Sequence, residues 1–295
     1  LRGRRRSCAP GPGRSRLWLW AAGAAAAIAA AAAAAMFWGS SRIGRDYAVP
    51  FSHPTALVWQ EDRLWAADWQ QQAVFRMRLT PRGLSVEKRY SMPESHITGM
   101  ALDGESVYVA DSWRGQIQRW NFRADRTTLD RSWPSPGERP SALFFDGEHL
   151  WSADMAEQRV YQHAVDDDLT VLRSFPVGHG PVGLFADEQK FWSADMENRL
   201  VYRHRWDLSL SLVEAYRLSG LDDGKAPLSS FTMRGRRVWL GRDGLDRLIE
   251  RPLWRFQHLP PPAAGAAAEP GPAAGIPDSE TSSETSSIDT PPGND

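Results

Sequence analysis

The residues of this chain best suited to chemistry recur at regular intervals. His53 and His96 are 43 residues apart, Arg139 follows after another 43, and His179 lies one residue outside the next equivalent position. An aspartate series keeps a similar rhythm, at Asp68, Asp111, Asp154, Asp195 and Asp243. Imidazole and carboxylate groups that converge suit a divalent cation or a small polar ligand. If the intervals reflect a structural repeat, these side chains lie on one face of the molecule.

Tryptophans and hydroxyl groups accompany these series. Trp69 and Trp113 follow the first two aspartates, and exposed aromatic rings are frequent anchors for binding partners. Thr55, Thr98, Ser141 and Ser229 form a hydroxyl series. The aspartates and hydroxyls also have a structural interpretation, which we favour, because such side chains satisfy backbone groups in turns. The predicted binding residues are therefore His53, His96, Arg139, His179, Trp69 and Trp113.

Other chemistry has little support in the sequence. The chain has no glycine-rich phosphate loop, no Gly-x-Ser-x-Gly motif and only one cysteine, Cys8. The acidic runs at 166–168 and 222–223 lack the spacing of a calcium loop. The formal net charge is −1 and the central part of the chain is nearly neutral, which argues against a nucleic-acid partner.

The residues that could do chemistry follow short apolar segments that repeat through the chain. An aromatic residue recurs within these segments at Trp65, Tyr108, Trp151, Trp192 and Trp239. A second aromatic series keeps the same register at Tyr47, Tyr90, Trp133, Phe175 and Tyr216. A repeat of roughly 40 to 45 residues built from short alternating segments is typical of a four-stranded β-propeller blade. The predicted fold is all-β, a single propeller of five four-stranded blades over residues 45–255.

The strand order predicts how the ring closes. The last repeat, at 228–253, is not followed by a segment with the pattern of a fourth strand. The segment around Tyr47 has this pattern and precedes every complete repeat. We therefore expect the N-terminal strand to complete the last blade, which would remove the exposed sheet edges at the seam.

The two ends of the chain differ from the repeat region. Residues 17–38 form an uncharged stretch long enough to cross a bilayer, and six arginines precede it in a basic segment at 1–16. By the positive-inside rule, we expect one signal-anchor helix in the plasma (inner) membrane, with a cytoplasmic N-terminus and an exported propeller. A cleaved signal peptide is the alternative. Residues 256–295, rich in Pro, Ala and Ser, are expected to be disordered.

The segments at 107–111 and 194–200 resemble NHL-repeat propellers, with Asn198-Arg199-Leu200 in the place of the eponymous Asn-His-Leu. The related propellers include senescence-marker/gluconolactonase-like and streptogramin-lyase-like proteins. The resemblance covers about residues 46–253 and implies the architecture. These relatives are typically six-bladed, whereas five repeats are present here, and no catalytic motif of theirs is complete in this chain.

Two functions follow from these features. The favoured one is a membrane-anchored extracytoplasmic module or scaffold that binds a protein, peptide or glycan through the loops around its channel mouth. The alternative is a metal-dependent, lactonase-like hydrolase or a lyase acting at the same mouth, with a divalent cation as its cofactor. Binding is favoured over catalysis because the predicted innermost strands carry small residues rather than a set of carboxylates.

Overall fold

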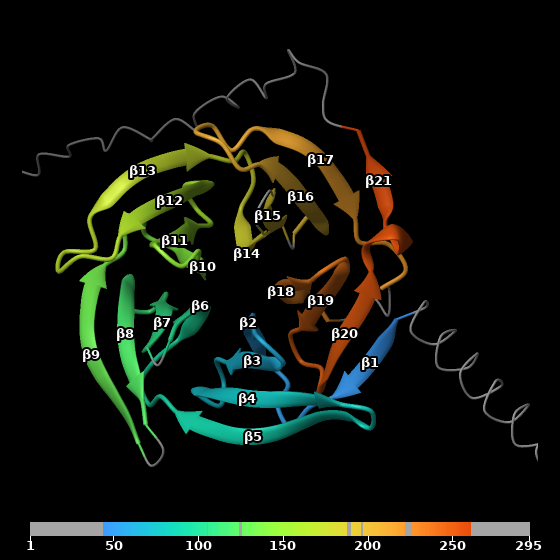
Figure 1. Ribbon diagram of the computed structural model, residues 1–295, viewed down its shortest axis with the longest axis horizontal. Coiled ribbons are helices and arrows are strands. Elements are labelled where there is room, and N and C mark those ends of the chain that lie inside the picture. Colours follow the sequence, from blue (N-terminus) through green and yellow to red (C-terminus); the bar gives the residue numbers. More distant parts are fainter. Residues whose placement is uncertain are drawn as a thin grey trace, which may run out of the picture. The chain divides into compact units, whose positions relative to one another are not determined.

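A computed structural model describes residues 44–104, 106–123, 126–187, 190–195, 197–221 and 226–260. Five antiparallel sheets surround a common centre (Figure 1). Blade 1 contains β2 (Pro54–Gln60), β3 (Arg63–Asp68), β4 (Ala73–Thr80) and β5 (Gly83–Ser91). Blade 2 contains β6 (Ile97–Asp103), β7 (Ser106–Asp111), β8 (Gln116–Phe122) and β9 (Thr127–Pro134). Blade 3 contains β10 (Pro140–Phe145), β11 (His149–Asp154), β12 (Arg159–Ala164) and β13 (Val171–Pro176).

The last two blades depart from simple sequence order. Blade 4 contains β14 (Pro181–Asp187), β15 (Lys190–Asp195), β16 (Leu200–Arg205) and β17 (Leu212–Arg217), with β21 (Gln257–Leu259) added outside β17. Blade 5 contains β18 (Leu228–Arg234), β19 (Arg237–Arg242) and β20 (Arg247–Pro252), and its outer strand is β1 (Arg45–Ala48). We call the four successive positions in a blade A, B, C and D, with A nearest the centre.

The predicted ring closure is confirmed. Strand β1 pairs antiparallel with β20, so that Tyr47 lies opposite Leu248. The Tyr47 ring stacks on Trp239 at 4.9 Å between centroids, and its hydroxyl donates a hydrogen bond to Glu250 (2.9 Å). Trp239 in turn meets Trp59 of blade 1 edge to face at 5.0 Å. The first strand therefore joins the last blade and also supports the seam with the first blade.

The aromatic residues of position B form the core between neighbouring blades. Trp151 of blade 3 stacks on Phe175 of its own blade at 5.8 Å and packs on Phe191 of blade 4 at 5.3 Å. All five members of this series, Trp65, Tyr108, Trp151, Trp192 and Trp239, are buried. Burial of large aromatic surfaces at each seam stabilises the ring without any disulfide.

Small residues at position A allow the inner strands to approach closely. A Cβ atom on Gly99 would lie 2.7 Å from the backbone of Ala142 in the next blade, and one on Gly183 would lie 2.8 Å from Cβ of Phe231. Both distances are too short for a side chain, so these two glycines are required by the crowding of strands around the axis.

The expected domain boundary at residue 255 is wrong by a few residues. A short 3-10 helix, η1 (Leu253–Arg255), turns the chain back, and Phe256 is buried in the core of blades 4 and 5. Strand β21 then pairs with β17, placing His258 opposite Tyr216. The segment 256–259 therefore belongs to the propeller rather than to the tail.

The expected anchor at 17–38, the basic segment at 1–16 and the tail beyond 260 lie outside the described residues. Within the described part of the chain, no helix is long and apolar enough to cross a membrane.

The hydroxyl series has a structural role that links the blades. Thr55 donates a hydrogen bond to the Ile97 carbonyl of the next blade (2.5 Å), and Thr98 donates to the Pro140 carbonyl (2.7 Å). Ser141 and Ser229 repeat the pattern on Pro181 and Pro54. Position A of blade 4 carries Val182, which has no hydroxyl for the Leu228 carbonyl. The ring of inter-blade hydrogen bonds is thus made at four of five seams.

We expect Val182→Thr to add the missing bond and to stabilise the domain. A net hydrogen bond contributes about 1 kcal/mol, and the two side chains have nearly the same shape. The free energy of unfolding in urea should rise by roughly this amount. The matched variant Thr98→Val should lower it by about 1 kcal/mol or more, because it leaves a carbonyl without its donor. Equal stability of all three proteins would contradict this role for the hydroxyl ring.

Candidate functional site

The D–A loops and B–C turns of all blades open on the same end of the ring, which we call the mouth. A cavity of about 380 Å³ lies there. Its wall is formed by Thr55, His96, Thr98, Ser112, Arg139, Pro140, Ser141, Met155, Gly180, Val182, Glu197, Leu228 and Ser229. Of the six predicted binding residues, His96 and Arg139 therefore line this cavity.

The buried aspartates hold the loops of the mouth in place. Asp68 accepts hydrogen bonds from the backbone N–H groups of His53 (2.8 Å) and Gln71 (2.7 Å), which joins the D–A loop to the B–C turn. Asp154 does the same with Arg139 (2.6 Å) and Glu157 (2.8 Å). These carboxylates are thus structural, as the turn interpretation predicted.

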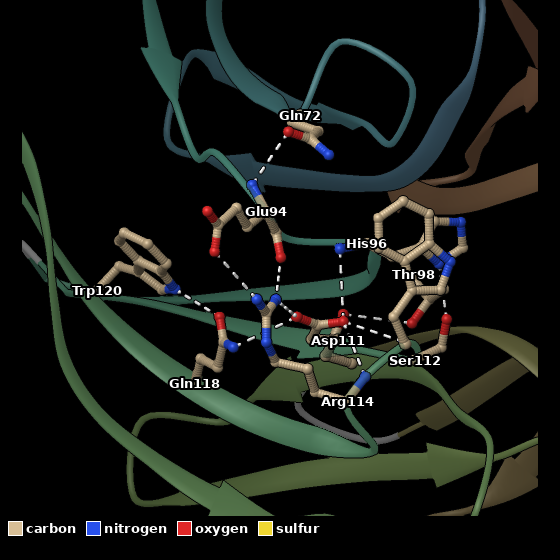
Figure 2. A network of polar contacts seen from close by, with 11 residues as sticks. Gln72, Glu94, His96, Thr98, Asp111, Ser112, Arg114, Gln118 and Trp120 are labelled. Atoms are coloured by element: carbon tan, nitrogen blue, oxygen red, sulfur yellow. Dashed lines mark hydrogen bonds and ion pairs between the residues drawn. The ribbon is translucent and has the colours of Figure 1, made fainter.

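Asp111 is the centre of the most extensive of these networks (Figure 2). Its Oδ1 accepts from the backbone N–H of His96 (3.4 Å) and of Trp113 (3.0 Å). Its Oδ2 accepts from the Arg114 guanidinium (3.0 Å) and from Gln118 Nε2 (3.3 Å). A single buried carboxylate therefore positions both aromatic residues that blade 2 contributes to the mouth.

The fifth aspartate does not belong to the series. Arg242, not Asp243, pairs with Leu228 at the position where Asp68 pairs with Pro54. The Arg242 guanidinium donates to the carbonyls of Leu221 (2.6 Å) and Ala226 (2.7 Å). It therefore binds backbone carbonyl groups, whereas the aspartates at this position bind backbone N–H groups. Asp243 is one residue further on and is partly exposed at the mouth.

Four aromatic rings form a continuous line along the mouth across blades 1 and 2. His53 meets Trp69 at 5.4 Å, Trp69 meets His96 at 5.2 Å, and His96 stacks on Trp113 at 4.7 Å. The Trp113 side chain is 62% exposed. We call His53, Trp69, His96 and Trp113 the aromatic strip. Such a surface suits partners that place an apolar or ring face against it.

Each histidine of the strip is oriented by a polar neighbour. His53 Nδ1 lies 2.6 Å from Asp243 Oδ1, to which Trp69 Nε1 also donates (3.4 Å). His96 Nδ1 lies 2.7 Å from Ser112 Oγ. Burial lowers the pKa of His96, and the Asp111 carboxylate partly opposes that shift. Burial thus favours the neutral form of the His96 ring.

Arg139 is a cation at the mouth with a free side chain. Its backbone is fixed by Asp154, whereas its exposed guanidinium makes no hydrogen bond or ion pair within the described part of the chain. An unpaired guanidinium beside a cavity can take a carboxylate or phosphate with two parallel hydrogen bonds.

His179 lies apart from the other predicted residues. It is 5% exposed, its ring stacks on Tyr202 at 4.1 Å, and its two nitrogens face the Val177 carbonyl (2.9 Å) and Ser193 Oγ (2.9 Å). Both ring nitrogens are thus occupied by protein groups. The one-residue offset from the His53 position places this side chain inside the blade instead of on the mouth.

Two buried serine–histidine pairs were not anticipated from the sequence. Ser152 Oγ lies 2.8 Å from His163 Nε2 in blade 3, and Ser193 Oγ lies 2.8 Å from His204 Nε2 in blade 4. Each Nδ1 faces a carbonyl, which can only accept, so His163 Nε2 accepts from the Ser152 hydroxyl. The Ser193 hydroxyl contacts both His204 Nε2 and His179 Nε2 and has one proton to donate to one of them. These pairs tie strand C to its C–D loop, since the carbonyls belong to Leu169 and Leu210. The signal would have been a serine and a histidine 11 residues apart in both repeats, with the histidine paired to the residue two positions before the serine.

The side chains do not fit the expected divalent cation. Among the described residues there is no group of three or more His, Cys, Asp or Glu side chains that could hold a metal ion. The buried aspartates direct their oxygens at turn amides instead. The donor set therefore gives no support to a metal-dependent reaction at the mouth.

Comparison with known proteins shows the fold. No protein-family profile and no curated protein sequence matches the chain. The crystal structure of a Myxococcus xanthus glutaminyl cyclase is similar, with a TM-score of 0.58 at 15% identity over 73% of this chain and 95% of that one. This chain is a five-bladed β-propeller. A catalytically inactive virginiamycin B lyase from Staphylococcus aureus with quinupristin gives a TM-score of 0.43 at 14% identity, over 68% of this chain and 66% of that one.

Proposed function

We propose that this propeller is a binding module of the plasma (inner) membrane, anchored through residues 17–38, exported, and able to hold a protein, peptide or glycan at its mouth. The observation that carries this proposal is the combination of a cavity of about 380 Å³ with the aromatic strip and the unpaired Arg139 at the same end of the ring. The cavity has room for a few residues or a sugar unit, and the strip extends its surface outward.

The chemistry of the mouth restricts the chemical class of the ligand. Four hydroxyls of the cavity wall already donate to neighbouring blades, and the Ser112 hydroxyl contacts His96. The wall therefore offers mainly apolar contacts from residues such as Met155 and Val182. Polar recognition then falls to Arg139, Glu197 and His96. A ligand with an anionic group for Arg139 and an apolar or ring face for Trp113 fits this arrangement best.

Binding should depend on Trp113 and Arg139 together. We expect Trp113→Ala/Arg139→Gln to weaken binding at least tenfold to the strongest ligands found on arrays of peptides and glycans. The melting temperature should stay within a few degrees, because both side chains are exposed. Trp254→Ala is the matched control, since Trp254 is similarly exposed, at 65%, but lies away from the mouth. Unchanged affinity in the double variant would contradict the proposal.

A lyase or hydrolase without a metal is a second candidate, and one observation favours it. The His53–Asp243 contact of 2.6 Å is a carboxylate–imidazole pair that fixes the ring for proton transfer. Mass spectrometry of array ligands after incubation would detect turnover. If His53→Gln abolishes turnover and retains affinity, the enzyme would be the better-supported of the two candidate functions.

A further inference from the structure

The chain enters the propeller at the end of the ring opposite the mouth. Strand β1 begins at Arg45, which pairs with Glu250 near the end of β20, and leads from there toward His53 at the mouth. Gly44 is packed so closely that a Cβ atom there would lie 2.4 Å from the Glu250 carbonyl oxygen. We call this end, formed by the A–B hairpins and C–D loops, the lower face.

The A–B hairpins of the lower face differ in charge. The A–B hairpins of blades 1 to 4 each carry an acidic residue, among them Glu61, Asp103, Asp146 and Asp187. The hairpin of blade 5, at 234–237, has three arginines and no acidic residue. Blade 5 is also the blade that contains β1 (Figure 1). The basic hairpin is thus the one beside the point where the chain enters.

Cations of this region are available to a partner. Arg236 and Arg255 are exposed, and their guanidinium groups make no hydrogen bond or ion pair within the described part of the chain. The exposed Arg234 lies over the Trp59 ring, 4.4 Å from its centroid. Arg237, by contrast, is bonded to Glu250.

Exposed apolar side chains lie on the same face. Trp254 in η1 is 65% exposed, and Leu208 in the C–D loop of blade 4 is 75% exposed. The Leu253 N–H donates to the Arg236 carbonyl (2.9 Å), which fixes η1 against the basic hairpin. Tryptophan is enriched at both membrane–water interfaces, where its ring lies at the level of the headgroups.

We propose that the lower face of blades 4 and 5, with Leu208, Arg236, Trp254 and Arg255, lies against anionic phospholipid headgroups, so that the mouth is directed away from the bilayer. This inference rests on the proposed membrane anchoring. Only residues 39–43 separate the expected anchor from Gly44, a span of at most about 18 Å when fully extended. The tether therefore brings this particular face, and not the mouth, to the membrane surface. Basic side chains there are attracted to anionic lipid.

Depth-dependent fluorescence quenching tests this orientation with the full chain. In a Cys8→Ser background, Leu208→Cys on the lower face or Gln70→Cys in a B–C turn at the mouth is labelled with a small fluorophore. Both sites are exposed. In vesicles of phosphatidylcholine and phosphatidylglycerol that contain a headgroup nitroxide lipid, quenching at position 208 should be at least twice that at position 70. Equal quenching would overturn the inference.

Charge variants separate lipid contact from simple proximity. Arg236→Glu/Arg255→Glu should reduce the quenching at position 208 by at least half. Arg126→Glu/Arg173→Glu, with the same change of charge on blades 2 and 3, should leave it unchanged. Equal effects of the two pairs would overturn the role assigned to this face. Cross-linking of Leu208→Cys between two chains, with no quenching, would show an interface between copies and would also overturn it.

A carbonate wash of the same vesicles tests the membrane anchoring separately from the orientation of the lower face. A chain that is released overturns the anchoring and this inference together. A chain that is retained, with equal quenching at positions 70 and 208, overturns the inference and leaves the anchoring intact.

Discussion

Replacement of Tyr47 by alanine is expected to destabilise the propeller by about 3 to 5 kcal/mol, the range for removal of a large buried ring. Tyr47 is 5% exposed and stacks on Trp239 at the seam between blades 5 and 1. The variant would leave a cavity at the only seam where the two ends of the ring meet. Urea unfolding followed by tryptophan fluorescence measures the change.

Tyr47→Phe serves as the control because it keeps the ring and removes only the hydroxyl that bonds to Glu250. Its cost should be about 1 to 2 kcal/mol, since Glu250 keeps its bond to Arg237. A Tyr47→Ala protein as stable as Tyr47→Phe would show that β1 is not essential for closure.

The second large effect is expected in acid. Burial lowers the pKa of His204 to about 4 and lowers the pKa values of His163 and His179 as well. The unfolded chain, with histidine pKa values near 6.5, then binds more protons than the folded one between about pH 4 and 6.5. The contribution of neutral His204 is therefore complete above pH 6.5 and is lost as the pH falls, by about 3 kcal/mol at pH 4.

A series of urea transitions from pH 7.5 to 4.5 checks this dependence. His204→Gln should flatten the slope between pH 5 and 6.5, although the variant itself is less stable. Carboxylates also lose stability in acid, and the pKa of Glu214 is lowered to about 2, but such groups act below about pH 4.5. The same slope in the variant and in the wild type would assign the acid sensitivity to other groups.

The architecture could be predicted because three independent features kept one register. Alternating apolar segments, the aromatic residues of positions B and D and the small residues of position A all indicated five blades. Closure through Tyr47 followed from the offset between complete repeats and outer strands. These are local patterns with a fixed period, which a sequence displays directly.

The site could be predicted only in part. His53, His96, Trp69 and Trp113 were placed on one face by their shared register, but no pattern showed that their rings form a line. Asp243 was assigned to the aspartate series because it lies one residue after Arg242. Arg242 occupies the position in blade 5 that is equivalent to Asp68 in blade 1. Strand β21 was missed because three residues are too few to show a period. The hydroxyl ring was missed as a link because its bonds join different blades.

The pairing of β1 with β20 has a consequence for the order of events during synthesis. The first strand cannot find its place until the last blade has emerged, about 200 residues later along the chain. If the N-terminal segment is held in the membrane during export, β1 stays near the bilayer. Blades 1 to 4 would then fold in sequence before β1 has its partner strand. The final blade then docks on a strand that is already in position. Attachment to the membrane would in this way reduce the search that closes the ring, since one of its two ends no longer diffuses freely.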